Sequence, residues 1–272
     1  MFRRPTAIVA GYATSDGAGV NLFRSLGTPS LPMLDPFLML DEFRSDDPGD
    51  YLAGFPPHPH RGFETVTYML AGAMHHEDSV GNSGDLGPGS VQWMTAGRGI
   101  IHSEMPRQED GLMWGFQLWV NLPREHKMMA PRYQDIPADR IPQVDVEGGR
   151  ARVIAGTFAG VAGPVLDSVT RPLMLDVQVD GELSVPVPAE HAVFAYVFEG
   201  SVSFGASTPI ERGHLVVLDD GDSVVARGDG RFLLLAGRPI GEPVARRGPF
   251  VMNTEEELRT AYADYQSGRL AG

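Results

Sequence analysis

Short apolar segments separated by turn-forming residues recur along the whole chain. The segments are about 4–8 residues long and rich in β-branched and aromatic residues, which is typical of β-strands. The clusters between them are rich in Gly, Pro, Asp and Asn. Many strands at this spacing predict an all-β protein built as a sandwich or barrel. The clearest strand candidates are residues 64–70, 173–179, 192–198, 215–218 and 232–235.

One segment near the end of the chain has the pattern of a helix. Thr254 is followed three residues later by Glu257, which is the arrangement of a capping box. Acidic residues in the first turn also suit the positive end of the helix dipole. We predict a helix that begins after Thr254, runs to about Gln266 and stops near Gly268.

The strand pattern of the first half returns in the second half. Residues 68–72 (YMLAG) resemble residues 196–200 (YVFEG), and residues 89–94 resemble residues 213–218. Two similar strand–turn–strand units in the same order predict a duplicated β domain, with chance similarity between strands as the alternative. The predicted organisation is an N-terminal barrel at 1–135, a linker at 136–150, a C-terminal barrel at 151–240 and a helical tail at 241–272.

Composition narrows the chemistry. The 272 residues include 22 Lys and Arg against 35 Asp and Glu, a formal net charge of −13, which argues against direct nucleic-acid binding. Cysteine is absent, so disulfides, thiol nucleophiles, zinc fingers and iron–sulfur clusters are excluded. No apolar stretch reaches the roughly 18 residues of a membrane helix. The first residues do not form a signal peptide, and we expect a cytoplasmic protein without a membrane partner.

Five of the eight histidines fall between residues 58 and 102. His58 and His60 are two positions apart, so on a strand both project from one face. His102 and Glu104 repeat that spacing further along the chain. If the two strands pair inside a barrel, three imidazoles and a carboxylate converge, a set that suits a redox-active divalent metal with open positions. The alternative is a group of structural or exposed histidines.

Two long segments around these histidines resemble the conserved boxes of the pirins, a branch of the cupin superfamily. They are residues 58–68 (HPHRGFETVTY) and 92–104 (QWMTAGRGIIHSE). Residues 117–123 (QLWVNLP), 127–128 and 248–255 (GPFVMNTE) are also similar to pirins. The resemblance implies two antiparallel, jelly-roll-like cupin barrels packed face to face. It also implies one divalent metal in the N-terminal barrel, held by His58, His60, His102 and Glu104.

Three other sets of residues near or related to the predicted site are expected not to bind the metal. Glu64 matches a glutamate that ligates metal in many other cupins but not usually in pirins, so we expect it beside the site, with a ligand role as the alternative. His75 and His76 are expected in a solvated hairpin loop, with the mouth of the pocket as the alternative. In the second half the ligand positions are lost, and that barrel is expected to be metal-free. The residues that replace the ligands are Pro186, Pro188, Ala226 and Gly228, with His191 and His214 nearby.

The resemblance implies an oxidoreductase activity of the quercetin 2,3-dioxygenase type. The substrate would be a flavonol-like aromatic molecule that reacts with O2, although a flavonol can stand in for another natural substrate. Glu104, the anionic member of the ligand set, would accept the substrate's hydroxyl proton as the catalytic base. Iron is the expected metal, with zinc, nickel, manganese or copper as replacements in recombinant protein. The alternative is a metal- or redox-dependent regulatory protein that acts through a protein partner.

Overall fold

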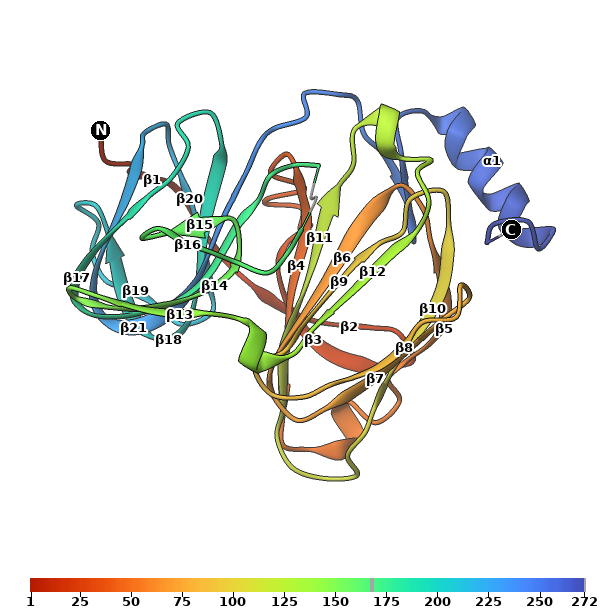
Figure 1. The fold of residues 1–272 in the computed structure, drawn as a ribbon, viewed down its shortest axis with the longest axis horizontal. Helices are drawn as coiled ribbons and strands as arrows, with labels where there is room; N and C mark the ends of the chain where they lie inside the picture. Colours follow the sequence, from red (N-terminus) through yellow and green to blue (C-terminus); the bar gives the residue numbers. More distant parts are fainter. Residues whose placement is uncertain (167–168, 272) are drawn as a thin grey trace. The chain divides into compact units, whose positions relative to one another are not determined.

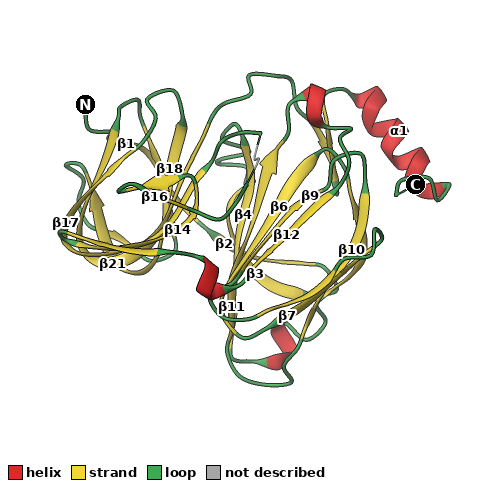
Figure 2. Cartoon of the chain, in the orientation of Figure 1, coloured by secondary structure: helices red, strands yellow, loops and turns green. Residues whose placement is uncertain are grey.

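The structure, a computed structural model, describes residues 1–166 and 169–271 and confirms the all-β class (Figures 1 and 2). Strands β1 to β23 make up most of the regular structure in this part of the chain. One α-helix, α1 (Glu255–Gln266), lies near the C-terminus, and three short 3-10 turns lie elsewhere. Among the described residues, no helix is long and apolar enough to cross a membrane. The chain groups into two compact units, each assembled from separate stretches.

The first unit, which we call the histidine unit, comprises residues 13–24, 37–138 and 240–272. It contains a seven-stranded sheet, a four-stranded sheet and a two-stranded sheet. The seven-stranded order is β12 (Arg132–Ile136), β9 (Val91–Thr95), β6 (Phe63–Ala71), β11 (Met113–Asn121), β4 (Phe37–Ser45), β3 (Val20–Leu26) and β2 (Tyr12–Asp16). The four-stranded order is β5 (Phe55–His60), β10 (Ile100–Pro106), β7 (Met74–Asp78) and β8 (Ser83–Leu86). The remaining elements are β22 (Ala245–Arg247), β23 (Phe250–Met252) and the turns η1 (Pro48–Asp50) and η2 (Arg124–His126).

The second unit comprises residues 1–12, 25–36 and 139–239. Its main sheet has the order β1 (Pro5–Ala10), β20 (His214–Leu218), β18 (Ala192–Phe204), β21 (Ser223–Gly237), β17 (Leu173–Pro186), β14 (Gly149–Ala155) and β13 (Gln143–Val146). β19 (Ile210–Glu211) pairs with β18, and β15 (Thr157–Phe158) pairs with β16 (Val161–Ala162). The turn η3 (Ala138–Arg140) lies at the boundary between the units. Alternate residues of β18, such as Val193, Ala195 and Val197, enter one large apolar core.

Two strands of the second unit are longer than the sequence predicts. β17 and β21 pair continuously from Leu173 opposite Ala236 to Pro186 opposite Ser223. Gly181 and Gly228 lie opposite each other in this ladder, and both have positive φ angles, 111° and 134°. Glycine allows a strand to bend without ending. The Asp180–Gly181–Glu182 segment is therefore a bend inside one long strand.

The compact units differ from the predicted contiguous domains at both ends of the chain. β1 pairs with β20, with Ile8 opposite Val216, so the first residues belong to the second unit. Residues 240–272 group instead with the histidine unit. There Arg61 Nη1 lies 2.8 Å from Asp264 Oδ2 of α1. The predicted boundaries at 135, 150 and 240 follow the order of the sequence, whereas each unit combines segments far apart in it.

The C-terminal helix begins as predicted. Thr254 Oγ1 accepts a hydrogen bond from Glu257 N at 3.2 Å, and Glu257 Oε2 accepts one from Thr254 N at 2.9 Å. This reciprocal pair is the capping box, and it satisfies amide groups that the helix itself leaves without partners. Leu258 and Ala261 form the buried face of the helix.

A buried lysine fastens the C-terminal segment to the rest of the histidine unit. Lys127 is 1% exposed, and its Nζ donates to Gly62 O at 2.7 Å, Asn121 Oδ1 at 2.7 Å and Val251 O at 3.0 Å. Burial lowers the pKa of Lys127 to about 7, because the ammonium loses its water. The three acceptors match the three N–H groups of the ammonium. Lys127 therefore ties β23 to the segments that carry Gly62 and Asn121.

Candidate metal centre

Two paired strands bring three histidines together. β5 and β10 are antiparallel, with His58 directly opposite His102 and with His60 two residues further along the same strand face. One ligand nitrogen from each of these three residues lies within 4.8 Å of the other two. His60 and His102 are buried and His58 is half-buried. The predicted convergence of the three imidazoles is present in the structure.

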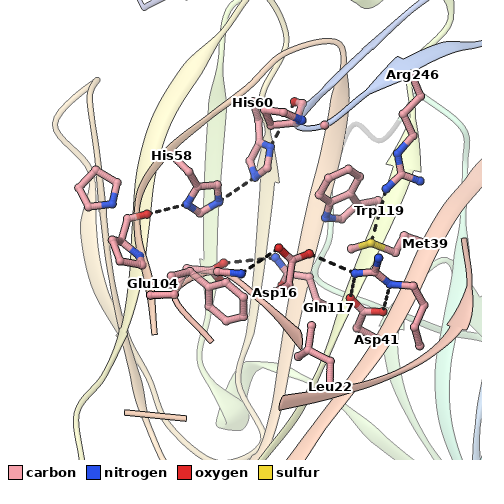
Figure 3. Close-up of a pocket in the computed structure, with 18 residues that line it drawn as sticks. Asp16, Leu22, Met39, Asp41, His58, His60, Glu104, Gln117, Trp119 and Arg246 are labelled. Atoms are coloured by element: carbon pink, nitrogen blue, oxygen red, sulfur yellow. Dashed lines mark hydrogen bonds and ion pairs between the residues drawn. The ribbon is translucent and has the colours of Figure 1, made fainter. Parts of the chain in front are cut away.

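Backbone carbonyls determine which nitrogen of His58 and His60 carries its hydrogen. His58 Nδ1 lies 2.9 Å from Pro56 O, and His60 Nδ1 lies 3.4 Å from Pro249 O. A carbonyl oxygen only accepts, so each Nδ1 carries the hydrogen and each Nε2 presents a lone pair. The two Nε2 atoms lie 3.0 Å apart (Figure 3). Two lone pairs at this distance repel one another, and a bound cation would remove the repulsion.

The third imidazole also presents a nitrogen without a partner. His102 Nε2 is buried and has no hydrogen-bond partner. Burial lowers the pKa of His102 and of His60 well below the ordinary value, and the neighbouring imidazoles lower both further. Both rings are therefore neutral at physiological pH, which is the form that ligates a metal. The donor set fits a divalent metal ion.

Glu104 lies in the same pocket but is held by side chains of the barrel. Thr67 Oγ1 donates to its Oε1 at 2.6 Å. Gln117 Nε2 donates to its Oε2 at 3.2 Å (Figure 3). Glu104 is 2% exposed and lines the pocket together with His58 and His60. The ligand nitrogens of His58, His60 and His102 lie within 4.8 Å of one another, and Glu104 is not part of this group. Its roles as fourth ligand and catalytic base remain predictions.

Glu64 lies outside both the histidine group and the pocket lining among the described residues. Its strand β6 pairs with β9, where Thr95 is directly opposite. Thr95 Oγ1 donates to Glu64 Oε1 at 2.7 Å. This contact engages the carboxylate within the seven-stranded sheet.

The prediction of a solvated loop for His75 and His76 is wrong. Both lie on strand β7, and His76 is fully buried. The tight turn at Gly72, with φ 76°, ends before Met74, so strand alternation resumes at once. Met74 and His76 therefore point inward. His75 points the other way and contacts the carboxylates of Asp85 and Glu77.

His76 continues the imidazole cluster toward a buried carboxylate. Its Nδ1 lies 3.4 Å from His102 Nδ1, its Nε2 lies 3.5 Å from Asp78 Oδ2, and its ring stacks on Tyr133 with centroids 4.8 Å apart. A hydrogen on His76 Nε2 would face Asp78 and leave His76 Nδ1 to accept from His102 Nδ1. His102 Nε2 then presents its lone pair to the cluster. His76 Nδ1 thus contacts His102 Nδ1, as backbone carbonyls contact Nδ1 of the other two histidines, whereas His76 Nε2 makes no hydrogen bond.

A pocket of about 580 Å³ opens beside His58, His60 and Glu104. Apolar side chains, among them Leu22, Met39 and Phe55, form part of its wall, and a charged group lies along another part (Figure 3). In that group Arg24 binds Asp41 with two hydrogen bonds of 2.7 Å and Asp16 with one of 3.1 Å. The volume is in the range of small-molecule sites.

The histidines of the second unit do not form a comparable cluster among the described residues. Among the described residues, the side chains that could hold a metal together are His58, His60 and His102, which lie in the histidine unit. His191 is buried, and its backbone oxygen accepts from Arg3 Nη2 at 2.9 Å. His214 Nδ1 lies 3.0 Å from Glu211 O. A metal-free second barrel remains a prediction.

Strand-rich units with a buried imidazole cluster on paired strands define a cupin-type protein. Comparison with known families gives the same class: residues 19–120 match the pirin family, and residues 173–271 match the C-terminal cupin domain of pirins. The chain belongs to the pirin family. The two-barrel cupin class predicted from the sequence is thereby confirmed.

Individual relatives match over nearly their whole length. The chain is 52% identical over 268 residues to a pirin-like protein of Caulobacter vibrioides, covering 96% of this chain and 97% of that one. It is 43% identical over 277 residues to the pirin of Homo sapiens, with 98% and 93% covered. The crystal structure of a quercetin 2,3-dioxygenase from Acinetobacter baumannii is similar with a TM-score of 0.92 and 32% identity. That match covers 100% of this chain and 99% of the other.

Proposed function

We propose that this protein is a metal-dependent dioxygenase of flavonol-like, hydroxylated aromatic substrates, with iron as its metal. The observation that carries the proposal is the set of three imidazoles whose ligand nitrogens converge at an open pocket. The similar Acinetobacter protein is named as a quercetin 2,3-dioxygenase, which supports the same reaction class. His58, His60, His102 and Glu104 would hold the ion. A bound metal would lower the pKa of a substrate hydroxyl, and the resulting electron-rich substrate anion would be the species that O2 oxidises.

Glu104 is the group that would take the substrate's hydroxyl proton. Thr67 and Gln117 each donate a hydrogen bond to the carboxylate and fix its orientation. The Gln117 bond to Oε2 is the longer of the two, at 3.2 Å against 2.6 Å, so we assign the proton to Oε2. General base catalysis of this kind contributes about 10²–10⁴-fold. The apolar wall of the pocket would hold the aromatic ring and keep water from it.

Metal content and oxygen uptake, measured on one iron-reconstituted preparation, test this function. We expect one iron per chain and oxygen uptake that depends on an added flavonol. Fully loaded protein that consumes no oxygen with flavonols or other hydroxylated aromatic compounds would overturn the enzyme proposal. That result would leave the regulatory alternative, in which the ion shapes a surface for a protein partner. Affinity capture with metal-loaded and metal-free protein would then look for a partner that binds only the loaded form.

A further inference from the structure

We propose that the pocket selects substrates that carry a carboxylate, and that Arg246 binds this group. The inference rests on the proposed function, because it places the substrate's hydroxyl at the histidine cluster and its carboxylate at the other end of the same pocket. It narrows the natural substrate, for which a flavonol would stand in, from hydroxylated aromatic compounds to hydroxylated aromatic acids.

Arg246 lies at a suitable place in the pocket. It comes from β22 and lines the same cavity as His58 and His60 (Figure 3). Trp119 lies between the two ends: its ring centroid is 5.3 Å from that of His60 and 4.6 Å from Arg246 Cζ. The guanidinium and the histidine cluster are thus separated by one indole ring. A single aromatic ring with a substituent at each end has matching dimensions.

The charges of the pocket distinguish Arg246 from Arg24. Arg24 is neutralised directly, because Asp41 Oδ2 lies 2.7 Å and Asp16 Oδ2 lies 3.1 Å from its Nη2. No carboxylate of the described residues lies within 4.0 Å of the Arg246 guanidinium. Its Nη1 donates to Leu38 O at 3.1 Å, and its Nη2 contacts Met39 Sδ at 3.7 Å. A guanidinium has five N–H groups, so this one retains donors for a ligand.

The guanidinium is also held in place before any ligand binds. The Trp119 ring and the Leu38 carbonyl orient its plane. A planar fork in a fixed position suits a carboxylate, which accepts two parallel N–H bonds. Burial lowers the pKa of Arg246, and the positive charge of Arg24 lowers it further. Asp41 and Asp16 raise this pKa, but the net shift is still downward. A carboxylate bound directly to the guanidinium would offset it.

Matched acid and amide probes test the proposal on anaerobic, iron-loaded protein. Calorimetry would compare 4-hydroxybenzoate with 4-hydroxybenzamide, which has the same ring and hydroxyl but no charge. The para position prevents the carboxylate and hydroxyl from chelating the metal together. We expect the acid to bind about tenfold to hundredfold more tightly, the range of a hydrogen-bonded charged pair. Arg246→Gln should reduce this preference to near one, and Arg246→Lys should retain part of it.

The neighbouring arginine provides the control. Arg247 lies on the same strand outside the pocket lining, and its Nη2 pairs with Glu255 Oε2 at 2.9 Å. Arg247→Gln should keep the full preference for the acid. Equal binding of acid and amide by the wild type, or a preference that survives in Arg246→Gln, would overturn the proposal. If Arg246→Gln does not fold, Arg246→Lys decides: an undiminished preference overturns the proposal, and a reduced one supports it.

Oxygen uptake on the same preparations separates the two proposals. A preference for the acid without any oxygen uptake would reject the dioxygenase and keep the Arg246 site. Oxygen uptake with flavonols but no preference for the acid would do the reverse.

Discussion

The interiors of the two units are filled by different kinds of side chain. In the second unit, strands such as β17, β18 and β21 contribute Val, Leu, Phe and Ala to one continuous apolar core. The histidine unit also buries apolar side chains, among them Val66, Trp93 and Phe116, but it adds many buried polar residues. These include His60, Glu64, Thr67, Gln92, His102 and Glu104.

Apolar burial stabilises the second unit, whereas the histidine unit also buries the polar groups that could carry out chemistry. Burial of apolar surface stabilises a fold by about 25 cal/mol per Å². A buried polar group costs free energy unless it finds a partner, so the histidine unit needs the network formed by Thr67, Gln117 and Thr95. The imidazole cluster still has a buried nitrogen without a partner, on His102. In this cluster the fold thus leaves a polar atom that a ligand could satisfy.

The largest expected effect is the loss of metal from a variant of the histidine unit. His102→Ala removes one of three clustered imidazoles and should abolish most metal binding, whereas His191→Ala in the second unit should leave it intact. Elemental analysis of chelator-washed, reconstituted protein measures both. Two ions per wild-type chain, or an unchanged metal content in His102→Ala, would contradict the prediction that only the histidine unit binds metal.

Replacement of the pocket carboxylate should have the next largest effect. Glu104→Gln keeps the shape and one oxygen but removes charge and basicity. We expect flavonol turnover to fall by about 10²–10⁴-fold, while metal content falls much less. Glu64→Gln is the matched control, because Glu64 is also buried but lies outside the pocket lining. A Glu104→Gln protein that keeps its iron and its full turnover would remove Glu104 from the mechanism.

The orientation of His102 by His76 can be tested through metal affinity. His76→Phe keeps the aromatic ring that stacks on Tyr133 but removes the nitrogen that faces His102. Loss of such an orienting partner typically weakens metal binding about 10–100-fold. His75→Phe on the same strand should leave affinity unchanged, since that ring points away from the cluster. Competition with a chelator measures both, and equal affinities in the two variants would contradict the role of His76.

Removal of the metal should affect the units unequally. An ion that binds only the folded site stabilises it by about 2.7 kcal/mol when present at 100 times its dissociation constant. Chelation should therefore lower the melting temperature and weaken amide-exchange protection in β5 and β10, but not in β17 and β21. The β signal in circular dichroism should persist at 25 °C, because the apolar cores do not include the ion. Its loss on chelation would show that the fold depends on the metal.

A further expected effect concerns a buried charge in the histidine unit. The pKa of Lys127 falls from 10.5 to about 7 on folding, so between these values only the unfolded chain holds the proton. Stability rises with pH wherever the unfolded chain binds more protons, so Lys127 should add a rise between about pH 7 and 10.5. Urea denaturation of the wild type and of Lys127→Met across this range should show the rise only in the wild type. Parallel curves would exclude it.

The sequence predicted those parts of the molecule that depend on local order. Strand alternation placed His58, His60 and His102 on shared faces, and the spacing of Thr254 and Glu257 located the helix start. Sequence patterns did not reveal contacts between residues that are distant in the chain. These are the hydrogen bonds from Thr67 and Gln117 to Glu104, and the position of Arg246 in the pocket. Gln117 lies in a segment already noted for its similarity to pirins, but no local pattern connects it to Glu104. The burial of His76 could have been predicted from the sequence. Met74 and His76 are two positions apart, so on a strand both side chains point to the same, inward face.

The return of residues 240–272 to the histidine unit has a consequence for how the protein is made. His60 is oriented by Pro249 O, the pocket includes Arg246, and Lys127 donates to Val251 O. A ribosome synthesises these residues only after the whole of residues 139–239. A nascent chain that has just produced its histidines therefore lacks the carbonyl that orients one of them and part of the pocket wall. Completion of the site thus waits for residues 240–272, so any metal ion that it binds would be captured late in translation.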